Sequence, residues 1–159
     1  MSLHILRISL LIHILSAMLW IGGMLFFALI VAPFLQTISN PHERSNIYHT
    51  VGKKFRLWGW VAISLLLITG WLNIYLMGVP LTAIFNPAFY NSSFGMALGV
   101  KLSMVFLIVI TSFLHDFIYG PKAGSEQRYS IIARWFGRVN LLIALVIVFL
   151  AVSLRLGGL

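Results

Sequence analysis

The chain has 159 residues, of which 60% are hydrophobic and 9% charged, and its mean hydropathy is +1.00. A soluble domain typically carries about 25% charged residues, so this composition excludes one and predicts an all-α integral membrane protein. The absence of cysteine excludes disulfides, thiolate metal sites, iron–sulfur clusters and c-type haem. In such a protein the net charge of +8 indicates basic cytoplasmic loops rather than nucleic-acid binding.

The first predicted membrane span covers residues 3–35. No charged residue lies between Ile8 and Pro41, and the stretch exceeds the ~20 residues that cross a bilayer, so the helix should tilt or protrude. Pro33 is expected to mark its end. A secretory signal peptide has a shorter apolar core and a cleavage site of small residues, so we interpret this stretch as a retained helix.

His13 lies inside this first span, in the uncharged run from His13 to Gly23. Ten residues separate it from Leu3, which puts it roughly 15 Å deep in a straight helix. An ionisable side chain at that depth is costly and indicates a function, and a neutral imidazole is a good metal ligand. Trp20 follows two turns later and should line the same stripe. The alternative is a structural histidine hydrogen-bonded to a neighbouring helix.

Three further spans are predicted at residues 55–77, 94–119 and 130–156. Gly78, Pro80 and the Asn86-Pro87 pair interrupt the stretch between the second and third spans. That stretch is uncharged and aromatic, so it is expected on the membrane surface. Together the four spans predict an up-down four-helix bundle, a single transmembrane domain over residues 1–159.

Positive charge predicts the orientation of these spans. Eight of the eleven Lys and Arg residues follow the first span or lie between the end of the third and the first turns of the fourth. Under the positive-inside rule both segments are cytoplasmic and both termini are extracytoplasmic. The eight residues are Arg44, Lys53, Lys54, Arg56, Lys122, Arg128, Arg134 and Arg138.

Other polar residues define two predicted layers. Lys101 lies about 10 Å into the third span from the outer side, and it is a candidate catalytic and cofactor-binding residue unless it snorkels to the interface. Asn73, a few residues from the outer end of the second span, is expected in the same outer layer as His13 and Lys101. His115 lies about 21 Å further along the same helix face, near the cytoplasmic boundary. His115 and His49 are candidates for a second metal site, and Arg56 is a candidate cofactor-binding cation there. The alternatives are an interfacial His115 and a solvated loop around His49.

Two ligands suit this arrangement. Haem b needs one or two axial ligands, an apolar slot and cations for its propionates, which His13, Trp20 and Lys101 or Arg56 offer. Copper transfer needs several His or Met side chains along one path. The chain has six Met residues, although Met also serves as packing filler.

Several short motifs follow one another along the chain. They are His13 with Trp20, Gly22-Gly23, Ala32-Pro33, Thr69-Gly70, Phe94-Gly95-Met96, Leu98-Gly99-Val100-Lys101-Leu102, and His115 with Gly120-Pro121. In this order, and over nearly the whole chain, they resemble the motifs of CopD-like membrane proteins, and more distantly those of HemJ-type protoporphyrinogen oxidases. With the HemJ type the chain shares the His-x6-Trp spacing, a basic segment before the second span, and Val-Lys then Phe-x-His in the third. Lys101 and His115 are fourteen residues apart, about a turn more than in the HemJ pattern.

The resemblance implies a four-helix membrane module of the bacterial inner membrane. HemJ-like proteins bind haem b through the first-span histidine and oxidise protoporphyrinogen, whereas CopD-like proteins, which have more spans when full-length, are associated with copper uptake. Carried over by position, His13 is the axial ligand and Lys101 the third-span lysine. We therefore predict a haem b protein in redox chemistry or electron transfer, with a porphyrin or quinone substrate, lipid contacts and a homo-oligomeric state. The alternatives are copper transport and a scaffold subunit without a ligand.

Overall fold

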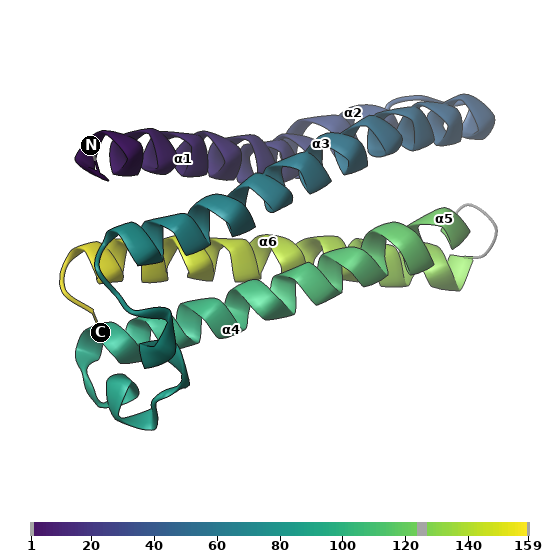
Figure 1. The fold of residues 1–159 in the computed structure, drawn as a ribbon. Helices are drawn as coiled ribbons and strands as arrows, with labels where there is room; N and C mark the ends of the chain where they lie inside the picture. Colours follow the sequence, from purple (N-terminus) through teal and green to yellow (C-terminus); the bar gives the residue numbers. More distant parts are fainter. Residues whose placement is uncertain (1, 124–126, 159) are drawn as a thin grey trace. The chain divides into compact units, whose positions relative to one another are not determined.

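The structure is a computed structural model that describes residues 2–123 and 127–158, and within these it contains helices joined by turns and short loops, with no strand. It divides into two compact units, Met1–Gly78 and Val79–Leu159. Each unit is built around one pair of long helices, α1 with α3 in the first and α4 with α6 in the second (Figure 1). The units are described separately below.

The first helix of the first unit runs through a proline. Helix α1 (Ser2–Phe26) continues into a π-helical turn, η1 (Phe27–Val31), and then into α2 (Ala32–Gln36). Pro33 has no N–H to donate and its ring crowds the preceding turn, so it cannot continue a regular α-helix. The wider π-helical turn directly before it accommodates this change. As a result the helix ends three residues beyond Pro33, at Gln36, one residue from the predicted boundary.

Helix α3 (Pro41–Leu76) begins fourteen residues before the predicted second span. The expectation of a basic loop was therefore wrong for this segment, which is helical. The cause is a strong start signal: the Asn40 side chain accepts hydrogen bonds from the backbone N–H of His42 (3.0 Å) and Glu43 (3.4 Å), and Pro41 occupies the first turn. At 36 residues the helix is about 54 Å long, so its basic first turns extend beyond the ~30 Å hydrocarbon core.

Helices α1 and α3 pack antiparallel. From the η1 end toward the N-terminus of α1, successive residues of α1 contact residues that lie progressively later in α3. Glycines allow the close approach, because an added Cβ at Gly23 would overlap the Phe55 ring. The contacts in order are Phe27 with Tyr48 (ring centroids 5.3 Å apart), Gly23 with Phe55, Trp20 with Gly59, and His13 with Thr69.

The second unit starts with two short turns and contains the other helix pair. Ser92 caps α4, accepting a 3.0 Å hydrogen bond from the N–H of Gly95. Helices α4 and α6 are antiparallel, since Ser112 meets Asn140 and Tyr119 stacks on Phe136. The elements are the 3-10 turns η2 (Leu81–Phe85) and η3 (Pro87–Asn91), α4 (Ser93–Phe113), the π-helical turn η4 (Leu114–Tyr119), α5 (Gly120–Lys122) and α6 (Gln127–Arg155).

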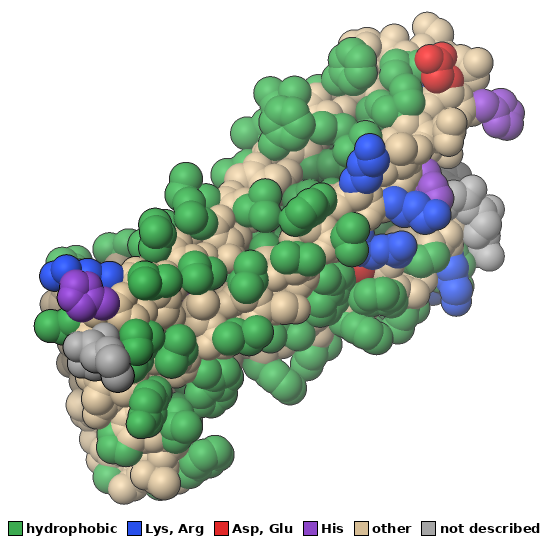
Figure 2. Space-filling view, turned by 45° about the horizontal axis from the view of Figure 1, so that its top comes forward, with side chains coloured by type: hydrophobic (Ala, Val, Ile, Leu, Met, Phe, Trp, Pro, Cys, Tyr) green, Lys and Arg blue, Asp and Glu red, His purple; other side chains and the backbone are tan. Residues whose placement is uncertain are grey.

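Four helices are long and apolar enough to cross a membrane, namely Leu3–Gln36, Pro41–Leu76, Ser93–Lys122 and Arg128–Arg155. This confirms the all-α, multi-pass membrane prediction, with each span close to its expected place except for the early start of α3. Many large apolar side chains are exposed, and hydrophobic side chains cover much of the face drawn in Figure 2. Such surfaces suit lipid rather than water. The orientation of the termini, the four-helix bundle and the single domain stay predictions.

Candidate functional site

The intramembrane histidine is held by a threonine of the neighbouring helix. His13 Nδ1 on α1 lies 2.7 Å from Thr69 Oγ1 on α3, and the Thr69 hydroxyl donates its own proton to the carbonyl of Leu65 at 2.6 Å. With that proton committed, the threonine oxygen accepts from His13. In this arrangement the His13 ring carries its proton on Nδ1, and the lone pair of the neutral ring is on Nε2. A hydrogen bond of this kind fixes the tautomer and ring orientation of a histidine ligand.

Two glycines of α3, Gly59 and Gly70, allow α3 to pack closely against the face of α1 that carries His13 and Trp20. A Cβ added to Gly70 would lie 3.5 Å from Cε1 of His13, and one added to Gly59 would lie 3.7 Å from Cδ1 of Trp20. Both are ordinary van der Waals separations, so the glycine backbone lies close against each ring. His13 and Trp20 thus face the same neighbouring helix, and Trp20 is buried.

A pair of orphaned polar atoms lies one helical turn from the histidine. Ser9 precedes His13 by four residues and Asn73 follows Thr69 by four, so the antiparallel packing puts them at about the same level. Ser9 is 3% exposed and Asn73 is 7% exposed, and neither Ser9 Oγ nor Asn73 Oδ1 has a hydrogen-bond partner. Buried polar atoms without partners are rare and often indicate a water molecule or an ion. The layer of Ser9, His13, Thr69 and Asn73 is therefore the candidate site, and we call it the His13 layer.

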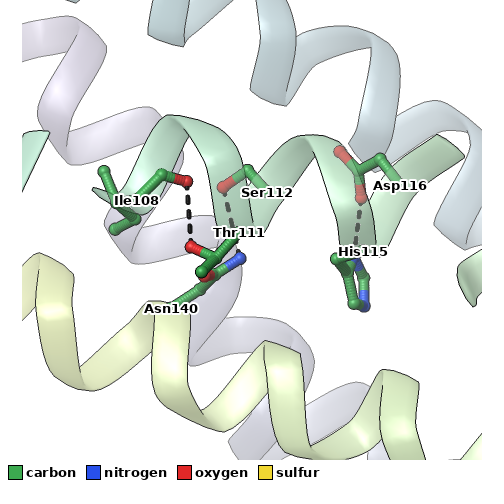
Figure 3. A network of polar contacts seen from close by, with 6 residues as sticks. All are labelled: Ile108, Thr111, Ser112, His115, Asp116 and Asn140. Atoms are coloured by element: carbon green, nitrogen blue, oxygen red, sulfur yellow. Dashed lines mark hydrogen bonds and ion pairs between the residues drawn. The ribbon is translucent and has the colours of Figure 1, made fainter. Parts of the chain in front are cut away.

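The second unit contains a separate polar cluster (Figure 3). The Asn140 amide on α6 donates to Ser112 Oγ on α4 at 3.2 Å, and both residues are 5% exposed. Asn140 Oδ1 has no partner. One turn further, on η4, His115 Nδ1 lies 2.7 Å from Asp116 Oδ1. A carboxylate beside the Nδ1 of a histidine is the arrangement of a carboxylate-supported histidine ligand.

The remaining predicted site residues lie apart from the His13 layer along the chain. His49 is exposed and lies twenty residues before Thr69 on α3, a separation of about 30 Å. Arg56 is half-buried on the same helix, about 20 Å from Thr69. Lys101 is half-buried on α4 of the other unit. No group of three or more His, Cys, Asp or Glu side chains that could hold a metal occurs within residues 2–123 and 127–158.

The comparisons with known proteins identify the family. Residues 49–154 match the family described as Copper resistance protein D, or CopD. That segment is two thirds of the chain. The chain belongs to the CopD family. It is also 36% identical over 152 residues to an uncharacterized protein of Aquifex aeolicus (strain VF5), covering 95% of this chain and 96% of the relative. No solved structure matches.

The CopD match and the His13 layer overlap only in part. The matched segment begins at His49 and includes Thr69, Asn73 and His115, whereas His13 lies before it. The Aquifex relative covers 95% of this chain, so most of α1 lies within that alignment.

Sequence reasoning found His13 but overlooked its partners. The sequence pattern indicates Thr69 only as part of a motif, and it does not indicate Ser9 or Ser112 as site residues. A signal was available, because Ser and Thr inside otherwise apolar membrane helices commonly hydrogen-bond across to a neighbouring helix.

Proposed function

We propose that this CopD-family protein handles copper in the membrane and that the His13 layer binds the ion in transit. The observation that carries the proposal is the hydrogen bond from His13 to Thr69, with the Thr69 proton given to Leu65. It supports a neutral imidazole whose Nε2 lone pair is the ligand, and imidazole is well suited to copper. The family description supports copper as the cargo.

The two buried oxygens without hydrogen-bond partners suggest that the layer also holds a water molecule beside the ion. Ser9 Oγ and Asn73 Oδ1 offer hydrogen-bonding positions beside an ion that enters an apolar region. They would hold a water molecule that the ion keeps as it loses its hydration shell, which lowers the cost of entry. His115 with Asp116 is a second proposed station, nearer the predicted cytoplasmic side.

Haem b at His13 stays a prediction, since the same Nε2 lone pair suits an iron. When bound, haem would supply one-electron chemistry. What this chain would contribute is the axial nitrogen and its orientation by Thr69. Redox activity, electron transfer, a porphyrin or quinone substrate and a catalytic role for Lys101 also stay predictions.

The test is a copper titration of the purified full-length protein against a Cu(I)-specific chelator, together with an optical spectrum after expression with ample haem. The wild type should bind copper, and His13→Ala should lose at least tenfold in affinity. His4→Ala is the matched control, because His4 is an exposed histidine of the same helix, and it should bind like the wild type.

Three outcomes would overturn the proposal. A Soret band with one haem per protein that His13→Ala abolishes would replace copper with haem. The absence of copper binding by the wild type would exclude copper handling. Unchanged copper binding and copper tolerance in His13→Ala would leave the layer structural, as expected of a scaffold subunit.

A further inference from the structure

The first unit has an apolar groove on the surface of the α1–α3 pair, away from the His13 layer. It has a volume of about 240 Å³. Two glycines are among its lining residues, and two of the large apolar side chains that line it are exposed, Leu19 (51%) and Trp58 (58%). The lining residues are Leu19, Gly23, Val51, Lys54, Phe55, Trp58 and Gly59.

Lys54 lines the groove with its aliphatic stem, because the lining is almost wholly apolar; its ammonium, the one charge carried by a lining residue, is therefore at the rim. Lys54 is exposed, and no acidic side chain of the described ranges, 2–123 and 127–158, forms an ion pair with it. It lies 22 residues before Leu76, about 33 Å along α3, which is close to the thickness of the hydrocarbon core. With the C-terminal end of α3 at one membrane surface, the Lys54 amine is therefore at the headgroup level of the other.

The surrounding charges have the same sign. Lys53 and Arg56 flank Lys54 on α3, and no acidic residue occurs between Arg44 and His115. The groove spans Val51 to Gly59, about 12 Å along the helix, and runs from the charged level toward the apolar core. Its shape and charge complement a molecule with an anionic head and a long apolar tail.

We propose that this groove binds one anionic phospholipid, with the phosphate on Lys54 and the first part of an acyl chain lying over Gly59 between Leu19 and Trp58. Basic pockets between membrane helices recognise anionic headgroups in this way. An interfacial Trp, with an apolar body and a polar N–H, suits the same level. The groove is thus a lipid site separate from the proposed copper path.

The proposal is tested by native mass spectrometry of the full-length protein titrated with phosphatidylglycerol or phosphatidylcholine. One Lys near a headgroup corresponds to about a fivefold preference, so the wild type should bind its first phosphatidylglycerol about five times more tightly than phosphatidylcholine. Lys54→Gln should abolish this preference, and Lys54→Arg should retain it.

The matched control is Lys53→Gln, which removes the same charge one residue away but does not line the groove, and it should keep the preference. Val51→Phe should weaken the first binding of both lipids because the larger side chain fills the groove. Equal losses in Lys54→Gln and Lys53→Gln would overturn the proposal in favour of diffuse attraction. A wild type without preference, or displacement of the lipid by millimolar glycerol 3-phosphate, would overturn it as well.

Discussion

Replacing Thr69 by Val tests the role of the His13–Thr69 hydrogen bond, because Val keeps the shape of Thr and removes the hydroxyl. Hydrogen bonds between membrane helices contribute about 0.6 kcal/mol on average and about 1.7 kcal/mol at most, so the protein should remain folded. Loss of a partner that orients a metal ligand costs roughly 10–100-fold in affinity, or about 1.4–2.7 kcal/mol. The loss in the free energy of copper binding should therefore exceed the average of about 0.6 kcal/mol that such a hydrogen bond contributes to folding.

Two measurements separate the effects of Thr69→Val. The chelator titration gives the copper affinity, and nitrogen NMR of the copper-free protein reports which ring nitrogen of His13 carries the proton. In the wild type that nitrogen should be Nδ1, and in Thr69→Val both tautomers should appear. Thr69→Ser should behave like the wild type.

Thr111→Val is the matched control for this experiment. The Thr111 hydroxyl donates to the carbonyl of Leu107 at 3.0 Å, as Thr69 does to Leu65, but among the described residues no histidine is hydrogen-bonded to it. Its copper affinity should be unchanged. If Thr69→Val binds copper as tightly as the wild type and keeps the Nδ1 proton, the threonine does not set the tautomer and the reasoning is refuted.

Two further predictions concern the fold and the orientation. Gly95→Ala should lower the free energy of unfolding in detergent by about 1–3 kcal/mol, because its Cβ would overlap the backbone carbonyl of Phe89, whereas Gly137→Ala, which has open space, should not; equal thermal shifts would contradict this. In this cysteine-free chain, an impermeant maleimide added to intact cells should label Asn91→Cys and spare Ser39→Cys, and the reverse pattern would invert the predicted topology.

The membrane helices were largely predictable because hydropathy over about twenty residues dominates every local preference. The exception is the start of α3, where the charged stretch from Arg44 to Arg56 was taken for a loop. Its helix signal was nevertheless local: Asn40 before Pro41 with Glu43 in the first turn is a capping pattern. Charge indicated correctly that the segment leaves the hydrocarbon core, but charge carries no information on whether the backbone there is helical.

The two π-helical turns could not be predicted from the sequence, for a different reason. Pro33 indicated that the first span was disturbed, but the residue alone permits a break, a kink or a widened turn. The structure has a widened turn at η1, and another at η4, which carries His115 and Asp116. Neither follows from periodicity, because a single π-helical turn shifts the helix phase by only one residue.

The partner of His13 could not be predicted because it depends on the register between two helices. The phase of α1 indicates which side His13 faces, but sliding α3 by one residue rotates its facing side chain by about 100°, so Thr69, Gly70 and Ile68 were equally available. One known contact removes this ambiguity. Once His13 meets Thr69, each turn up one helix corresponds to a turn down the other, which brings Ser9 and Asn73 to one level. Both residues of this pair have a buried oxygen without a hydrogen-bond partner, and that observation, together with His13, supports the proposal that the layer binds an ion.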